Sequence, residues 1–149
     1  MNASNPVVEA LTKLLADSYT LYLKTQNFHW NVTGPQFFEL HNTFETHYRE
    51  LAEAVDEIAE RIRALEAFAP GSYTAFRKVA TIEECTELLS AEQMVSALTA
   101  DLQEVASTAR KLMIAASEAG DEVTMDLAVQ RAAIHDKQAW MLRSMQSRG

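Results

Sequence analysis

The sequence predicts an all-α protein built as a bundle of four long helices. The 149 residues include only four Gly and three Pro, and these breaking residues divide the chain into four long segments. No segment has the alternating apolar and polar residues, bounded by turn residues, that are typical of β-strands. A chain of this length is about the size of one domain, so we expect a single domain over residues 1–149.

The first two helices have clear boundary signals. Asn5 is a favourable N-cap residue, and Pro6 suits the first helical position because an N–H there would have no partner. We expect this helix to reach about Val32 and the second helix to cover roughly 35–67. The second helix has apolar residues at alternating spacings of three and four, the pattern of a helix packed on one face. These residues are Phe37, Leu40, Phe44, Tyr48, Leu51, Val55, Ile58, Ile62 and Leu65.

The second half of the chain predicts a crossover and two more helices. The segment SYTAFRKVA, residues 72–80, indicates a short extra helix in the crossover between helices two and three. The third long helix is expected from Ser90, which opens a capping-box pattern, to Gly120. Asp121 is the expected N-cap of the fourth, which reaches about Ser147. Four helices of about thirty residues with one longer middle connection are typical of ferritin-like and cytokine-like bundles.

Charge and composition exclude several function classes. Lys and Arg number 13 against 21 Asp and Glu, a net charge of −8, so the protein's field repels phosphate and favours cations. The single cysteine, Cys85, excludes an internal disulfide or a cysteine zinc cluster. The first residues have neither a basic segment nor an uninterrupted apolar run, and no stretch reaches the roughly 18 apolar residues of a membrane span. We therefore expect a cytoplasmic protein with no membrane partner.

A polar stripe on the second helix is the main functional signal. His41, Glu45, Asp56 and Glu60 lie near 0°, 40°, 60° and 100° on a helical wheel at about 100° per residue. The apolar residues of the same helix cluster near about 300°, so the stripe points away from the chain's own core. A solvated charged face is the ordinary explanation of such a stripe.

Two further features of the second helix favour a partner subunit over a solvated face. Phe38, Ala52 and Ala59 lie on the same stripe, where a large aromatic and small residues suggest a covering helix. The spacing is also palindromic, because 41 pairs with 60 and 45 with 56 about one midpoint. Antiparallel pairing with a second copy would place His41 opposite the partner's Glu60, and Glu45 opposite the partner's Asp56. A divalent cation would offset the desolvation of such a cluster.

The residue types limit which metal site is feasible. Imidazole with several carboxylates suits iron, zinc or manganese and lacks the thiolates of a structural zinc site. The intrachain di-iron site of ordinary ferritins needs Glu-x-x-His, and none of the four histidines has Glu three residues before it. His29 lies on the apolar face of the first helix, where a lone histidine is more often a satisfied core residue.

The segment HWNVTGPQFFELHNTFETHYRELAEAVDEIAERI resembles the signature of the Dps family, the ferritin-like mini-ferritins first named as DNA-binding proteins from starved cells. The match includes His29-Trp30-Asn31, the break at Gly34, His41 twelve residues after His29, and the Asp56-x-x-Ala59-Glu60-Arg61 run. The family's last helix and its entry are also similar to segments 120–127 (GDEVTMDL) and 135–144 (HDKQAWMLRS) of this chain. The resemblance therefore covers nearly the whole chain.

The resemblance implies a ferroxidase centre at a dimer two-fold axis. His29, His41 and Glu45 would come from one chain and Asp56 and Glu60 from its partner, together holding two irons that cycle between Fe(II) and Fe(III). Glu45 stands where many members have Asp. The resemblance also implies a hollow dodecamer built from two-fold dimers, which stores ferric mineral and uses hydrogen peroxide or dioxygen as oxidant.

Three more residues acquire candidate roles from the resemblance, each with an ordinary alternative. Trp30, beside His29, is a candidate redox residue, although aromatics near helix ends more often pack. Asp121 and Asp126 match the family's acidic iron-entry pore, whereas Asp121 also suits an N-cap and first-turn acids favour the helix dipole. Gln130, one turn later, is not acidic. His47 and His135 are expected to be structural.

Two rival functions remain open at this stage. A nucleoid-binding protein that compacts DNA is disfavoured, because the first basic residue is Lys13, inside the first helix, and the C-terminus offers only Arg143 and Arg148. We therefore expect DNA binding to be absent or weak at physiological salt. An inert structural or cytokine-like bundle would take up no iron and would assemble no further than a dimer.

Overall fold

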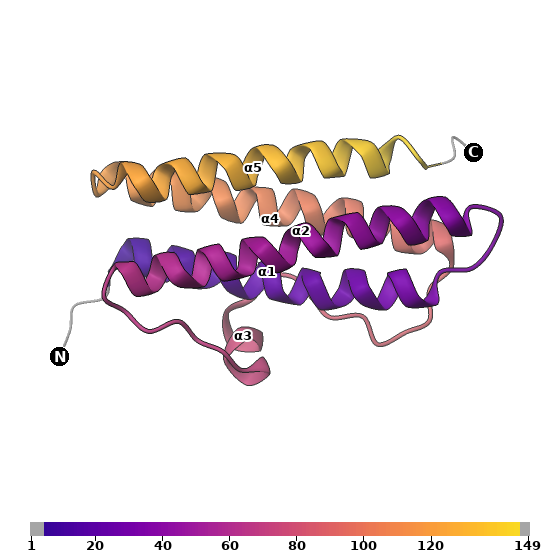
Figure 1. The fold of residues 1–149 in the computed structure, drawn as a ribbon, viewed down its shortest axis with the longest axis horizontal. Helices are drawn as coiled ribbons and strands as arrows, with labels where there is room; N and C mark the ends of the chain where they lie inside the picture. Colours follow the sequence, from indigo (N-terminus) through magenta and orange to yellow (C-terminus); the bar gives the residue numbers. More distant parts are fainter. Residues whose placement is uncertain (1–4, 147–149) are drawn as a thin grey trace.

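The computed structural model describes residues 5–146 and confirms the all-α fold: the described residues form five helices and no strand (Figure 1). Four of the helices are long, and the short one lies in the crossover, as the sequence predicts. The helices are α1 (Pro6–Asn31), α2 (Phe37–Ala64), α3 (Tyr73–Val79), α4 (Ala91–Glu118) and α5 (Glu122–Arg143).

The four long helices lie alongside one another as a bundle (Figure 1). α1 packs against α2 and α4, and α4 packs against α5. α3 contacts α1 and lies outside the bundle, below α1 in the view of Figure 1. None of the helices in the described part is long and apolar enough to cross a membrane.

The predicted starts of α1, α4 and α5 agree with the structure. The Asn5 side chain accepts hydrogen bonds from the first-turn amides of α1, and Ser90 forms the predicted capping box with Gln93 at the start of α4. Asp121 caps α5 by accepting from the backbone N–H of Thr124. Each cap satisfies amides that the helix itself leaves without partners.

Three predicted boundaries were wrong by a few residues, among them the end of α2, which lies at Ala64 rather than about 67. α2 begins at Phe37 rather than 35, because the turn before it needs Gly34 at φ +111°, a conformation that helices exclude and glycine adopts freely. α5 ends at Arg143 rather than about Ser147. The hydroxyl of Ser144 bonds the carbonyl of Trp140 at this end. Ser147 and the basic Arg148 lie outside the described residues.

The two faces of α2 differ as the wheel predicts. Leu40, Phe44, Leu51, Ile58 and Ile62 are all fully or almost fully buried in the core. The opposite face carries Phe38 with 77% of its surface exposed, together with the exposed Asp56 and Glu60. The single chain therefore leaves an aromatic ring and two acids uncovered on one helix face.

A buried carboxylate holds the crossover against the bundle. Asp17 of α1 is fully buried and accepts four hydrogen bonds: from the backbone N–H groups of Thr81 and Ile82 and from the hydroxyls of Thr81 and Thr108. Thr81 and Ile82 follow α3, and Thr108 belongs to α4. One side chain thus ties α1 to the crossover and to α4, and a charge buried in this way is tolerated because its oxygens are paired.

A second polar network crosses the core between α2 and α5. Glu50 accepts hydrogen bonds from both terminal nitrogens of Arg131. Arg131 also contacts Nε2 of His135 at 3.0 Å. Because a guanidinium only donates, this Nε2 is the acceptor, and the ring proton sits on Nδ1, which donates to Gln138. His135 is therefore held as a neutral imidazole, in agreement with its predicted structural role.

Acidification should weaken the fold through His135. Burial, reinforced by the charge of Arg131, lowers the pKa of His135 from 6.5 to about 4. The unfolded chain takes up a proton near pH 6.5 and the folded chain does not, so stability falls as the pH drops from about 6.5 to about 4. The loss attributable to this group is up to about 3 kcal/mol.

Urea unfolding of the wild type and of His135→Gln at pH 7 and pH 4.5, at one protein concentration, measures this loss. His47 and Glu50 are kept in the variant, so the difference between the two pH dependences reports His135 together with its electrostatic interactions with these two groups. We expect a smaller loss of stability in the variant. Equal losses in the two proteins would contradict the assignment.

Candidate metal centre

The turn between α1 and α2 brings two histidines together. His29 lies in the last turn of α1 and His41 in the second turn of α2. The backbone N–H of Val32 still bonds Phe28 at the end of α1, and Gly34 then reverses the chain. The side chains of His29 and His41, twelve residues apart in sequence, consequently face each other.

Reciprocal hydrogen bonds fix both imidazole rings. Nδ1 of His29 lies 2.7 Å from the backbone carbonyl of His41, and Nδ1 of His41 lies 2.7 Å from the carbonyl of His29. A carbonyl oxygen only accepts, so each Nδ1 carries the proton and donates it. In the neutral ring, each Nε2 then has a free lone pair, which is the form in which imidazole binds a metal.

Aromatic contacts hold the two rings from several sides. The imidazoles stack on each other with centroids 3.8 Å apart. Phe37 stacks on His41 at 4.9 Å, and Tyr48 presents an edge to His29 at 5.2 Å. His29 itself is buried. These contacts limit ring rotation, so the Nε2 atoms keep their direction without a bound metal.

Glu45 supplies a carboxylate one turn after His41. Its Oε1 lies 3.9 Å from Nε2 of His29, and its Oε2 accepts a hydrogen bond of 2.8 Å from Nε of Arg49. The hydrogen bond from Arg49 lowers the pKa of Glu45. The carboxylate is therefore ionised at neutral pH, with one oxygen on Arg49 and the other near the histidines.

His29, His41 and Glu45 form the one group of potential metal ligands found within residues 5–146. One atom from each of the three lies within 4.8 Å of the others. Two neutral imidazoles and a carboxylate suit iron, zinc or manganese. Three ligands leave a divalent ion with open coordination positions, a feature of catalytic rather than structural sites.

Asp56 and Glu60 lie apart from this group within the chain. Glu45 and Asp56 are separated by eleven residues of one continuous helix, about 16 Å along its axis. Both acids are exposed, and they share the face of α2 that carries Phe38. The structure thus brings together three of the five predicted ligands and leaves two on the same uncovered surface.

Comparison with known proteins decides the family. The ferritin-like domain model matches residues 8–148. The DNA protection during starvation protein 2 of Bacillus anthracis is 40% identical over 138 residues, covering 93% of this chain and 94% of that protein. The chain belongs to the ferritin-like Dps family. The resemblance carried by the segment from His29 to Ile62 is therefore confirmed.

Solved Dps structures share the whole fold. Dps from Staphylococcus aureus superimposes with a TM-score of 0.93 at 37% identity, covering 99% of this chain and all of that chain. Dps from Vibrio cholerae O1, described as a member of a broad superfamily of ferritin-like diiron-carboxylate proteins, gives a TM-score of 0.89 at 31% identity, covering 97% and 98% of the two chains. The ferritin-like alternative for the bundle is thus the correct one.

Of the remaining predicted residues of this Dps chain, Trp30 is exposed and the two acids have local partners. Trp30 is 60% exposed beside the centre. Asp121 serves as the N-cap of α5 and also pairs with Arg61 at 3.1 Å, so its structural role is observed. Asp126 is exposed, and one of its oxygens accepts a hydrogen bond from Gln130. Its role in an iron-entry pore stays a prediction.

Sequence reasoning missed three residues around the centre of this Dps chain. Phe37 and Tyr48 have the spacing of core residues, and that spacing concealed their contacts with the imidazoles. Arg49 follows Glu45 at i+4, the spacing at which charged side chains meet on a helix, so this pair could have been predicted. The reciprocal histidine bonds depend on the geometry of the turn, for which the sequence has no comparable signal.

Proposed function

We propose that this protein is an iron-storage ferroxidase. Fe(II) is its substrate, and it is oxidised at a two-iron centre shared between subunits. The ferric product is stored in a hollow dodecamer, and the reaction protects against oxidative stress. The observation that carries the proposal is the preorganised group of His29, His41 and Glu45, whose Nε2 atoms are not tied up by backbone hydrogen bonds. The other two candidate ligands, Asp56 and Glu60, lie on the exposed face of α2 that carries Phe38.

A two-fold pairing of α2 with its copy would complete the centre. In an antiparallel pair centred between Glu50 and Leu51, Asp56 and Glu60 of the partner subunit would approach the three ligands of the first chain. The exposure of Phe38 supports burial of this face, because large exposed aromatics are typical of interfaces. Each dimer would then hold two identical sites.

Electron counting favours a pair of irons with peroxide as oxidant. Each Fe(II) supplies one electron, and hydrogen peroxide needs two electrons for complete reduction to water. Two adjacent irons can therefore reduce peroxide without releasing hydroxyl radical, which makes the same centre protective. The carboxylates neutralise the charge of the ferric products. Dioxygen is the alternative oxidant.

The rest of the assembly follows from the same proposal. Three copies each of Asp121 and Asp126 around a pore would attract Fe(II), as would the net charge of −8. That charge also opposes binding to DNA phosphates. We infer that any protection of DNA acts by removing iron and peroxide in the cytoplasm rather than by compacting DNA.

Anaerobic Fe(II) addition followed by a stoichiometric pulse of peroxide tests the proposal. Ferric absorbance and hydroxyl-radical yield are recorded for the wild type, for Glu60→Ala and for Glu57→Ala, an exposed acid that lies off the stripe on the same helix. We expect rapid oxidation to a soluble ferric product with little radical in the wild type and in Glu57→Ala, and loss of both effects in Glu60→Ala. Oxidation no faster than in buffer would overturn the proposal.

A further inference from the structure

All four tyrosines of the chain lie in one row of ring contacts. The sequence contains only Tyr19, Tyr22, Tyr48 and Tyr73. Tyr48 contacts Tyr22 with centroids 6.0 Å apart, Tyr22 contacts Tyr19 at 5.6 Å, and Tyr19 contacts Tyr73 at 6.3 Å. These residues come from α2, α1 and α3, so packing of three helices rather than sequence spacing creates the row.

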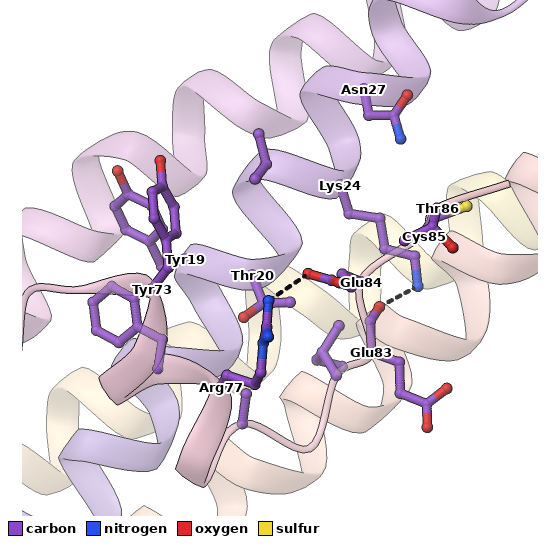
Figure 2. Close-up of a pocket in the computed structure, with 14 residues that line it drawn as sticks. Tyr19, Thr20, Lys24, Asn27, Tyr73, Arg77, Glu83, Glu84, Cys85 and Thr86 are labelled. Carbon is purple, nitrogen blue, oxygen red and sulfur yellow. Dashed lines mark hydrogen bonds and ion pairs between the residues drawn. The ribbon is translucent and has the colours of Figure 1, made fainter. Parts of the chain in front are cut away.

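The row connects the metal centre with the surface. At one end, Tyr48 lies edge-on against the metal-ligand candidate His29 at 5.2 Å. At the other end, Tyr73 is 67% exposed in the single chain. Tyr19 and Tyr73 line one end of a pocket between α1, α3 and the crossover (Figure 2).

We propose that the tyrosine row carries a one-electron oxidation away from the centre when a single iron has reacted with peroxide. This inference rests on the proposed ferroxidase function. Tyrosine and tryptophan are the aromatic side chains that most readily give up one electron. A row of such side chains in contact gives an oxidising equivalent short steps instead of one long transfer.

The reaction balances with one tyrosine as the missing electron donor. One Fe(II), one hydrogen peroxide and one tyrosine give one Fe(III), one tyrosyl radical, one hydroxide and one water. The iron and the phenol each lose one electron, the O–O bond breaks, and the phenol proton ends in water. At the surface, a soluble one-electron reductant such as ascorbate supplies an electron and a proton to restore tyrosine.

The local charges favour movement outward. The guanidinium of Arg49 lies 5.6 Å from the ring centroid of Tyr48, where a nearby cation disfavours loss of an electron from that ring. The charge of Arg49 also acts on Tyr22, the next ring, but less strongly than on Tyr48. Tyr19, Tyr22 and Tyr48 are each only partly buried, and the proposal requires their phenol protons to pass to water at each step.

Trp30 is the competing donor, and its geometry is less favourable. It neighbours His29 in sequence, but its ring is 60% exposed and contacts no other ring among the described residues. An oxidation on Trp30 would therefore stay beside the centre. Ring contacts also lead from His41 through Phe37 to the exposed Phe38, but phenylalanine has no phenol to oxidise, so the row through Tyr48 is the oxidisable one.

Freeze-quench electron paramagnetic resonance tests the row. Anaerobic protein receives one Fe(II) per two-iron site and one equivalent of peroxide, and the radical is identified by growth on ring-deuterated tyrosine. The wild type, Tyr22→Phe and the off-row control Trp140→Phe are then mixed with ascorbate. Tyr22→Phe keeps the ring volume in the middle of the row and removes its oxidisable phenol.

We expect a tyrosyl radical in all three proteins and a several-fold slower loss of this radical to ascorbate in Tyr22→Phe only. A tryptophan radical in the wild type, or equal radical decay in Tyr22→Phe and the wild type, would contradict electron transfer through the tyrosines. Neither result would contradict the proposed ferroxidase function. Oxidation at two Fe(II) per site is measured in parallel. Its absence in the wild type would overturn the ferroxidase function and the row together.

Discussion

Co-assembly of two inactive variants, His41→Ala and Asp56→Ala, is expected to restore about one quarter of the wild-type Fe(II) oxidation. Each variant alone is expected to lose fast oxidation, because every site in a pure assembly lacks one ligand. In a mixed dimer, one site lacks both His41 and Asp56. The other site takes an intact His41 from one variant and an intact Asp56 from the other. Half of randomly formed dimers are mixed, and half of their sites are intact.

The matched control for this rescue is a mixture of two variants whose missing ligands belong to the same chain's part of the site. His41 and Glu45 belong to the same ligand group of one chain, so a mixture of His41→Ala with Glu45→Ala leaves no intact site in any dimer. In each mixture, the two variants are unfolded and refolded in the same solution. Mass spectrometry then verifies that mixed dimers have formed. No activity in the His41→Ala and Asp56→Ala mixture, with mixed dimers present, would exclude a shared centre.

Replacement of Asp17 by alanine is expected to destabilise the chain by about 3–5 kcal/mol. The variant loses a fully buried carboxylate and leaves the amides of Thr81 and Ile82 without an acceptor. The crossover would detach from α1, and the hydroxyl of Thr108 would lose one partner. The effect is large because buried donors, once unpaired, keep their full desolvation cost.

Chemical unfolding of Asp17→Ala beside Glu83→Ala measures this loss. Glu83 is exposed in the same crossover segment, and its backbone carbonyl, which accepts from Lys24, is unaffected by the substitution. We expect the Glu83→Ala variant to remain within about 0.5 kcal/mol of the wild type. Similar values for both variants would show that Asp17 does not anchor the crossover.

The sequence predicts those features that depend on local spacing. The caps at Asn5, Ser90 and Asp121 and the two-faced pattern of α2 are local, and the structure agrees with them. The palindromic stripe is also local, which explains why His41, Glu45, Asp56 and Glu60 could be proposed as ligands from spacing, whereas His29 is proposed only from the family resemblance. Their combination across a subunit interface remains a prediction.

Features that depend on long-range packing could not be predicted. Asp17 lies in an apolar stretch where an acid is unexpected, and its partners are 64 to 91 residues away. The network of Glu50 with Arg131 also spans 81 residues. His29 shows the same limit, because its position in the sequence indicates only a core histidine. Its orientation becomes clear only from the hydrogen bond to the carbonyl of His41 in the folded chain.

The paired bonds between His29 and His41 also bear on how the centre is refilled. Each ring is tied to the backbone of the opposite helix, so the loss of side-chain freedom that accompanies ligation has already occurred during folding. Under the proposed function, an arriving Fe(II) would only have to shed water and engage Glu45, with no rearrangement of α1 or α2. A storage protein must pass many ions through each centre, and a half-site that keeps its shape when empty suits this repeated use.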